Sequence, residues 1–506
     1  MASPSPHLVF STAHELQQQL ADGKITSVEL VDLFLHQIKR HNHEGLKVNA
    51  VLAVMPREVA IERARMLDQE RQEGRVWSVL HGIPIIIKDA IVTDQSLGMP
   101  TTVGAHAFAT LKAKANAKLV DQLIDAGIIV FAKATLTEFC GLKSNNTPMG
   151  WSAYGGQTLS AYRTEGLDEK DQPFSAGSSS GTAVGIITGF SPIGIGTETT
   201  GSIVYPASAS GLYGMRISSR SVSLDGVFSL SKSFDSVGGM ARDPADLAAL
   251  TEVLLTEEAR SRVSESGYEK AMGEGWEGMG VGVLSSTWGV DESIVKGKWD
   301  LPSVVDVYES AVKTMESHGC RIVYPLQCAD ADTLKYEDLD LTKLAYHEFP
   351  AQVEKFVNNF EHDADMTNLQ DIIAWNVKHK EKAMPEPYTT QTELIKAANS
   401  SNNITLEVHA TAVRELHRLA GCDGMSKVMD EHGLDVVLSA SESRLVTYAG
   451  CAGWPIATVP LGNLEKNGQP IGMFAIARAR REDVLLRFMA GWHATFKGAE
   501  PPVVPV

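Results

Sequence analysis

Serine, glycine and threonine gather in residues 176–214, where they could supply a nucleophile and backbone donors. The stretch reads AGSSSGTAVGIITGFSPIGIGTETTGSIVYPASASGLYG. Such a composition is typical of flexible linkers, but here apolar residues such as Val184, Ile187 and Ile195 lie between the small ones. We therefore expect a packed backbone whose amides can approach a substrate oxygen closely. A glycine-serine loop without chemistry is the plainer alternative.

A serine hydroxyl is a weak nucleophile until a neighbouring base removes its proton. No histidine–aspartate pair is obviously placed for this task, but a lysine can do it where burial keeps its amine neutral. Lys88 follows the apolar run 81–87, and Lys133 follows the apolar run 128–132. We expect Lys133 to be structural. The plainer interpretation of Lys88 is a lysine at a strand end that reaches solvent or pairs with Asp89.

A second arrangement of the nucleophile is open. Residues 177–181, GSSSG, match the G-x-S-x-G motif of a nucleophile elbow, in which Ser179 would attack. That motif requires a strand directly before it. Residues 169–175 are polar and contain Pro173, so the sequence gives the elbow little support.

Three separated segments occur in a fixed order: 80–89, LHGIPIIIKD; 176–182, AGSSSGT; and 196–207, GTETTGSIVYPA. Together they resemble the lysine segment and the two serine loops of the amidase-signature family, which includes fatty acid amide hydrolase and the amidotransferase A subunits. The flanking segments 233–242, SFDSVGGMAR, and 453–460, GWPIATVP, are also similar to that family. The resemblance runs from about residue 8 to about residue 495.

Carried over by position, the resemblance implies a Ser-Ser-Lys triad. Ser202 would attack the carbonyl carbon, Ser178 would relay the proton, and Lys88 would be the base. In the family the serine at the place of Ser178 follows a cis peptide bond. The implied reaction is hydrolysis of an amide through an acyl-enzyme. The oxyanion hole would be formed by the backbone amides of Thr199, Thr200, Gly201 and Ser202.

The sequence departs from the family pattern around the nucleophile. Thr200 stands where the family usually has glycine, Glu198 where it has aspartate, and Val204 where it has arginine. A β-branched residue at 200 restricts the backbone and narrows the floor of the pocket. These departures question the oxyanion geometry or the usual substrate range, but they remove no member of the triad.

The loop after residues 135–139 lines the acyl pocket in the family. The resemblance therefore implies that four residues of this chain lie near the substrate, although loop packing explains each of them equally well. They are Ser144, Asn145, Met149 and Trp151.

Buried apolar runs alternate with amphipathic segments along the chain, which favours an α/β fold. With the resemblance, we expect three α/β/α layers around a large mixed sheet, in a single domain over residues 1–506. The core motifs would lie in 80–245, and a divergent, pocket-shaping region in about 330–430. A capping box, Thr26 with Glu29, predicts a helix start. Strands are expected at about 81–87, 128–132, 192–196, 321–324, 435–439, 456–460 and 471–476, and helices at about 57–73, 117–126, 304–315, 404–432 and 482–492.

Composition limits the class of protein. The 506 residues are 43% hydrophobic and carry a formal net charge of -17, which argues against nucleic-acid binding. No run of 18 apolar residues predicts a membrane span. Five scattered cysteines without a CxxC pair, and an N-terminus unlike a signal peptide, favour a cytoplasmic protein. We find no metal-ligand spacing, P-loop or dinucleotide motif, and expect no cofactor and no metal.

We expect a small-molecule amide as substrate, with a homodimer left open. Three other functions stay open at this point. An acyltransferase or amide-forming biosynthetic enzyme would use the same acyl-enzyme with an amine or alcohol as acceptor. An amidotransferase A-type subunit would release ammonia for a partner. An inactive binding protein could share the fold.

Overall fold

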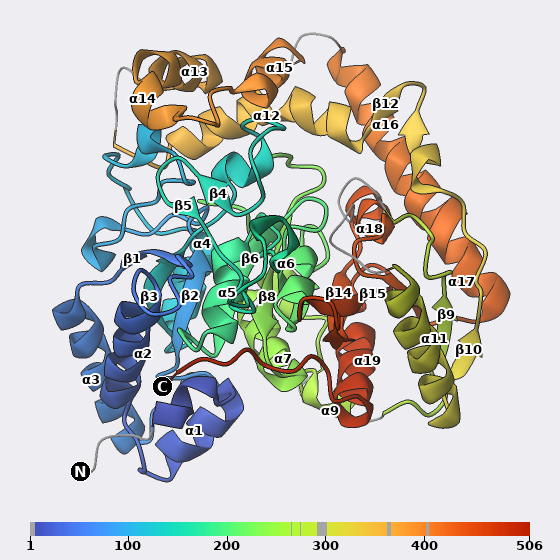
Figure 1. Cartoon of the computed structure of the whole chain (residues 1–506), viewed down its shortest axis with the longest axis horizontal. Coiled ribbons are helices and arrows are strands. Elements are labelled where there is room, and N and C mark those ends of the chain that lie inside the picture. Colours follow the sequence, from blue (N-terminus) through green and yellow to red (C-terminus); the bar gives the residue numbers. More distant parts are fainter. Residues whose placement is uncertain are drawn as a thin grey trace.

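The computed structural model describes residues 6–264, 266–273, 275–290, 301–361, 366–400 and 404–505. Within them an eleven-stranded sheet runs through the molecule in the order β1-β3-β2-β6-β8-β7-β14-β15-β13-β9-β10 (Figure 1). Its strands are β1 (Val51–Val54), β2 (Pro84–Lys88), β3 (Ile129–Ala134), β6 (Ile193–Glu198), β7 (Tyr213–Arg216), β8 (Ser236–Ala241), β9 (Gly280–Val283), β10 (Arg321–Val323), β13 (Val436–Ala440), β14 (Ile456–Asn463) and β15 (Pro470–Ile476).

The sheet is mixed, as the sequence predicts. Strand β2 pairs in parallel with β3 and with β6, and β9 pairs in parallel with β13 and with β10. The remaining pairs are antiparallel. All five residues of β2 are buried, which fits the short apolar strand expected before Lys88. Strands β7 and β8 were not predicted from the sequence. Their residues, YGMR and SVGGMA, show neither an alternation of apolar and polar residues nor a run of β-branched residues.

Helices cover both faces of the sheet. Thr182 in α5 (Ser180–Ile187) lies against Gly194 of β6, and Leu247 in α7 (Pro244–Leu254) lies against Gly239 of β8. Gly239 pairs with Ile195, the residue next to Gly194. Because successive residues of a strand face opposite sides, α5 and α7 lie on opposite faces.

The other helices extend these two layers. Helix α6 (Val204–Ala209) contacts α5, whereas α4 (Lys118–Asp125) and α19 (Glu482–Thr495) contact α7. The α/β/α architecture therefore agrees with the expectation from sequence. Two short two-stranded sheets, β4 (Trp151–Ser152) with β5 (Gly156–Gln157) and β11 (Lys335–Tyr336) with β12 (Leu339–Asp340), lie outside the main sheet.

The N-terminal helices α1 (Ala13–Ala21), α2 (Ser27–His41) and α3 (Arg57–Gln72) flank one end of the sheet (Figure 1). The capping box of Thr26 and Glu29 is confirmed at the start of α2. The buried carboxylate of Asp246, in α7, accepts hydrogen bonds from the backbone N–H groups of Ala13 at 2.7 Å and His14 at 2.9 Å. This contact ties α1 to the middle of the chain.

The divergent region forms an arc of helices along the top and right of the view in Figure 1. It contains α12 (Leu341–Val357), α13 (Leu369–Lys378), α14 (Lys380–Ala383), α15 (Thr392–Ser400), α16 (Leu406–His417), a π-helical segment (Arg418–Ser426) and α17 (Lys427–His432). Helix α18 (Leu445–Ala452) packs on the π-helical segment and also contacts β15 and α12.

Candidate active site

Lys88 is the last residue of β2, and its side chain has no exposed surface. Its Nζ donates to Ser178 Oγ at 2.7 Å, to Thr197 Oγ1 at 2.9 Å and to Thr197 O at 3.3 Å. Burial lowers the pKa of Lys88 because desolvation penalises the ammonium form, although the nearby Cys140 and acidic groups oppose this shift. The lysine thus points into the protein rather than to solvent.

Ser178 follows a cis peptide bond from Gly177 and lies just before α5. The cis peptide bond that the family resemblance implies before Ser178 is therefore present. A Cβ atom on Gly177 would lie 2.5 Å from Thr137 Oγ1 and 3.3 Å from Met149 Cβ, so only glycine fits between these neighbours. The Ser178 carbonyl accepts the Thr137 N–H at 3.0 Å, which fixes the loop against the segment after β3.

Ser202 lies on the turn between β6 and α6 and is partly exposed. Its carbonyl accepts the N–H of Ser179 at 3.1 Å, so the two serine loops are joined through their backbones. Gly201 has φ +89°, and a Cβ there would lie 2.1 Å from the Tyr205 ring. Only glycine suits this turn, which places Ser202 beside the Ser178 loop.

Two buried carboxylates stabilise the turn that carries Ser202. Glu198 Oε2 accepts the N–H groups of Ile203 at 2.6 Å and Val204 at 3.1 Å. Asp235 Oδ1 accepts the Thr199 hydroxyl at 2.6 Å. Burial raises the pKa of Glu198, and it raises the pKa of Asp235 to about 6. The longer glutamate at 198 still reaches the backbone, so this departure from the family leaves the turn supported.

Thr200 and Val204, the other two departures, occupy apolar surroundings. Val204 is fully buried within a hydrophobic cluster that includes Tyr205. Thr200 packs toward α18, where its Cγ2 would lie 3.0 Å from a Cβ on Gly450. Because residue 450 is a glycine, the side chain of Thr200 has space beside α18.

A second network supports the loop that carries Asp235. Glu348 in α12 accepts the Ser231 hydroxyl at 2.5 Å, the Ser233 hydroxyl at 2.5 Å and the Ser233 N–H at 3.1 Å. His409 Nε2, from α16, lies 3.0 Å from the same carboxylate. Burial alone would raise the pKa of Glu348, but these partners lower it to about 2. The divergent helices therefore hold the loop next to the turn that carries Ser202.

Lys133 has the contacts of a structural lysine. Its buried Nζ donates to Thr101 Oγ1 at 2.7 Å and to the Ile91 carbonyl, and lies 3.6 Å from Asp89 Oδ1. Burial lowers the pKa of Lys133 to about 8, with Asp89 opposing the shift. Asp89 in turn accepts two hydrogen bonds from Thr102. These contacts join Lys133 to the loop after β2.

The four residues expected near the substrate divide into two pairs. Ser144 Oγ lies 2.6 Å from Thr390 Oγ1, and Asn145 Oδ1 accepts the Thr392 hydroxyl at 3.1 Å, so both join the divergent region. Met149 is 44% exposed and lies next to Gly177. Trp151 is 8% exposed and packs against Tyr388 with ring centres 4.5 Å apart.

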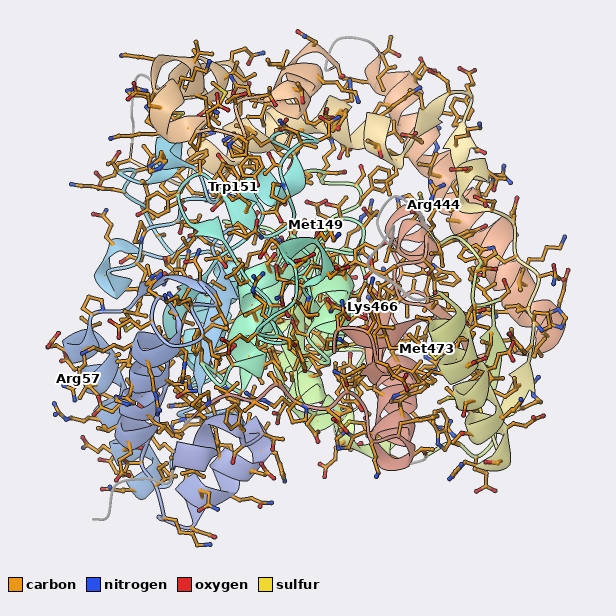
Figure 2. All side chains as sticks on the ribbon, in the orientation of Figure 1. Arg57, Met149, Trp151, Arg444, Lys466 and Met473 are labelled. Carbon is orange, nitrogen blue, oxygen red and sulfur yellow. The ribbon has the colours of Figure 1, made fainter. Side chains whose placement is uncertain are left out.

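Figure 2 shows Met149 and Trp151 between the central elements and the arc of divergent helices. Of the four, Met149 is therefore the one that both approaches the serine loops and retains an exposed apolar surface. Ser144 and Asn145 hold the loop in place.

Ser179 lacks the setting of a nucleophile elbow. Residues 172–178, all described, form no strand, and Ser179 is fully buried at the start of α5. Its Oγ donates to the Thr197 carbonyl at 3.4 Å. The alternative nucleophile thus lacks both the strand and the exposure that the motif requires.

Sequence reasoning missed two residues beside Lys88. Thr197 belongs to the third motif, directly before Glu198, and its position there is the signal that could have indicated it. Cys140 Sγ lies 3.9 Å from Thr197 Oγ1, in a segment where Phe139 and Cys140 have φ of 51° and 54°. No pattern in the sequence marks Cys140.

Chemically, the site joins a buried amine to the Ser178 hydroxyl, and the turn that carries Ser202 is linked to the same loop through its backbone. In the described residues no group of three His, Cys, Asp or Glu side chains could hold a metal ion, and no helix is long and apolar enough to span a membrane. Such a fold and site are characteristic of enzymes that cleave acyl bonds with a serine.

Comparison with known proteins identifies the family. Residues 29–486 match the model of the amidase family, and the chain belongs to this family. The native peptide amidase from Stenotrophomonas maltophilia has a structure similar to this one, with a TM-score of 0.86 and 27% identity over 99% of this chain and 100% of that one. The protein is thus a hydrolase acting on carbon–nitrogen bonds.

Two further relatives bear on the function. A putative amidase of Arthroderma benhamiae is 27% identical over 485 residues, covering 90% of this chain and 78% of its own length. The A subunit of the glutamyl-tRNA(Gln) amidotransferase of Chloroflexus aurantiacus is 36% identical, but only over 51% of this chain and 48% of its own length. The similarity to the fungal protein extends along most of the chain, whereas that to the amidotransferase covers about half.

Proposed function

We propose that the protein hydrolyses a carboxylic amide through an acyl-enzyme on Ser202, with Ser178 as proton relay and Lys88 as base. The observation that carries this proposal is the 2.7 Å contact between Lys88 Nζ and Ser178 Oγ, two side chains that are both buried. In its ammonium form Lys88 donates to all three oxygens, those of Ser178 and of the Thr197 hydroxyl and carbonyl. Once neutral, the amine has two N–H groups and one lone pair, so the two Thr197 oxygens can accept its N–H groups while the lone pair accepts from the Ser178 hydroxyl.

The proposed reaction proceeds in two stages. Ser202 Oγ bonds to the carbonyl carbon while its proton passes to Ser178, whose own proton passes to Lys88. The C–N bond then breaks, and the leaving amine takes a proton back along the same path. Water hydrolyses the acyl-enzyme by the same relay and releases the acid.

The backbone N–H groups of the turn would stabilise the oxyanion. These are the amides of Thr199, Thr200, Gly201 and Ser202, of which the Gly201 N–H also has the Glu198 carboxylate as a partner, on a turn that Glu198 and Asp235 support. Each such donor typically contributes about 3–4 kcal/mol to catalysis. We propose that Met149, with Trp151 behind it, forms part of the acyl pocket, and that Ser144 and Asn145 support it.

The test is to label the protein with a fluorophosphonate and to identify the modified residue by peptide mass spectrometry. We expect label on Ser202, none in Ser202→Ala, and full labelling in Ser179→Ala. In parallel, ammonia release from a dipeptide amide should fall on the order of 10⁴-fold or more in Ser202→Ala. Label on Ser179, or activity in Ser202→Ala near that of the unmodified enzyme, would refute the assignment.

A further inference from the structure

The hydroxyl group of Thr197 lies between the amine of Lys88 and the thiol of Cys140. Thr197 Oγ1 is 2.9 Å from Lys88 Nζ and 3.9 Å from Cys140 Sγ. In the part of the chain that the structure describes, these are the two side chains within hydrogen-bonding distance of that oxygen. Because the hydroxyl carries one proton, it can donate to only one of them at a time.

The direction of this proton decides what the neutral amine of Lys88 can do. If Thr197 donates to Lys88, the lone pair of the amine is occupied, and the amine can only donate to Ser178. If Thr197 donates to Cys140 instead, its oxygen accepts an N–H from Lys88, and the lone pair is left for the Ser178 hydroxyl. Only the second arrangement makes Lys88 a base toward Ser178.

Strand pairing fixes the position of the Thr197 oxygen. Thr197 belongs to β6, which pairs in parallel with β2, the strand that ends at Lys88. In this register Ile87 lies opposite Ile195, so Lys88 and Thr197 follow within two residues on neighbouring strands. A β-branched threonine also has few allowed side-chain rotamers. The hydroxyl oxygen therefore stays beside the amine, and only its proton is free to turn.

A tight turn anchored in the core fixes the position of the Cys140 sulfur. Cys140 has φ +54°, a left-handed conformation that few residues other than glycine adopt. Phe139, directly before it, is fully buried and packs against Phe108 and Phe228, with ring centres 6.2 Å and 6.0 Å away. The buried phenyl ring thus holds the turn that directs the thiol toward Thr197.

We propose that Thr197 and Cys140 are positioning residues for the base: the sulfur accepts the Thr197 hydroxyl proton and so keeps the lone pair of Lys88 directed at Ser178. A thiol sulfur is a weak acceptor. Inside a protein, however, a polar proton without any acceptor is costly, so even a weak acceptor can decide its direction. This inference rests on the proposed role of Lys88 and adds the contacts that orient its amine.

The alternative is a direct action of the thiol on Lys88. Burial lowers the pKa of Lys88, and Cys140 is foremost among the groups that oppose this shift, ahead of Asp235 and Glu198. Such an effect would not need the Thr197 hydroxyl. A double-mutant cycle with Thr197→Val separates the two explanations, because valine has nearly the shape of threonine but carries no hydroxyl.

The cycle measures kcat and KM for hydrolysis of a dipeptide amide, and the rate of fluorophosphonate labelling at Ser202. Cys140→Ala should lower kcat about three- to tenfold and leave KM unchanged, because the lost contact acts on proton transfer. Cys140→Ser keeps an acceptor at this position and should recover most of the loss. Thr197→Val should lower kcat more than Cys140→Ala, and adding Cys140→Ala to Thr197→Val should cause no further fall.

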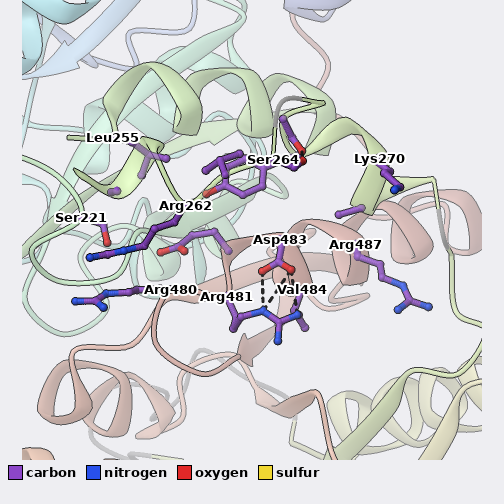
Figure 3. Close-up of a pocket in the computed structure, with 16 residues that line it drawn as sticks. Ser221, Leu255, Arg262, Ser264, Lys270, Arg480, Arg481, Asp483, Val484 and Arg487 are labelled. Carbon is purple, nitrogen blue, oxygen red and sulfur yellow. Dashed lines mark hydrogen bonds and ion pairs between the residues drawn. The ribbon is translucent and has the colours of Figure 1, made fainter. Parts of the chain in front are cut away.

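Two substitutions serve as matched controls. Ser221 is a buried serine at the cavity that Figure 3 shows, and neither Thr197 nor any residue of the proposed triad lines that cavity. In the Ser221→Ala background, Cys140→Ala should keep its full effect on kcat. Cys328 is partly exposed, as Cys140 is, and packs on a different hydrophobic cluster, so Cys328→Ala should leave kcat unchanged.

Equal effects of Cys140→Ala in the unmodified and Thr197→Val backgrounds would overturn the proposal, as would an unchanged kcat in Cys140→Ala. Lys88→Arg, measured beside the cycle, keeps this result separate from the proposed function. If Lys88→Arg loses activity, an additive cycle refutes only the roles of Thr197 and Cys140. Activity retained in Lys88→Arg would remove the proposed base and this inference with it.

Discussion

The amine of Lys88 is surrounded by hydroxyl and carbonyl oxygens, with no carboxylate hydrogen-bonded to it within the described chain. Lys133 differs, because Asp89 lies 3.6 Å from its Nζ. A lysine that has a carboxylate partner tends to stay charged, whereas a buried lysine among neutral groups favours the neutral form. Lys88, at the end of β2, and Lys133, the penultimate residue of β3, are therefore suited to different roles, the proposed base at 88 and a structural cation at 133.

Replacing Lys88 by arginine tests this difference. Arginine keeps the positive charge but does not release its proton in proteins, so we expect kcat to fall about 10²- to 10⁴-fold. In the unmodified enzyme kcat/KM should rise with pH and level off below the ordinary lysine pKa of about 10.4, because burial lowers the pKa of Lys88. Amide hydrolysis measured across pH 5–10 gives both results.

Lys112→Arg is the matched control, since Lys112 is exposed, and it should leave the profile unchanged. If Lys88→Arg kept its activity and pH profile, Lys88 would have no part in proton transfer.

At the scale of elements, α12 and α16 are linked by a short chain of contacts to the turn that carries Ser202. Glu348, which lies 3.0 Å from His409 Nε2, accepts hydrogen bonds from Ser231 and Ser233, and Asp235 in the same loop accepts one from Thr199. The divergent region is thus connected to the candidate site through Glu348. It fixes the geometry of the turn that is proposed to form the oxyanion hole.

Glu348→Gln should therefore lower kcat more than it raises KM. The amide has one acceptor oxygen instead of two, so at least one buried partner loses its bond, at a cost of about 1–3 kcal/mol. If half of this reaches the transition state, kcat falls about two- to tenfold. Glu354→Gln, on the exposed side of the same helix, should change neither constant. Equal effects of the two substitutions on steady-state kinetics would disprove the coupling.

The sequence predicts those elements whose signal lies within a short run of neighbouring residues. Strand β2 with Lys88 is an unbroken apolar run, and the helix from Ser27 begins with a complete capping box. The two serine loops are identifiable because their residues resemble the serine loops of the amidase-signature family. By contrast, Glu348 lies 115 residues from Ser233, and nothing in the sequence around either residue indicates their contact. Cys140 near Lys88 was missed for the same reason.

At the scale of the whole molecule, buried acidic groups make stability depend on pH. Burial raises the pKa of Asp246 to about 7, above its ordinary value of about 3.9 in the unfolded chain. Between these values the folded state binds the extra proton, so its stability falls as pH rises from about 4 to about 7. Glu138, with a pKa of about 7 raised by burial, contributes in the same direction.

Asp246→Asn should reduce this dependence. We expect the fall in Tm between pH 5 and pH 7.5 to be smaller in the variant than in the unmodified protein, by the equivalent of about 2 kcal/mol. Asp125→Asn makes the same charge change at an exposed position and should leave the fall unchanged. Differential scanning calorimetry at the two pH values measures this, and parallel curves for Asp246→Asn and the unmodified protein would contradict it.

The order of the strands also determines when the sheet can be fully paired while the chain is being synthesised. The first six strands in the order, β1 to β7, come from residues 51–241 and can pair as soon as they leave the ribosome. Strands β9 and β10 are made next, but they join the sheet only through β13, which pairs with β15. β9 and β10 cannot join the sheet until about 150 more residues have been made. The edge of β7 stays unpaired until β14 emerges. A ribosome that stalls before residue 456 would therefore hold a nascent chain with unpaired strand edges, the kind that chaperones protect from aggregation.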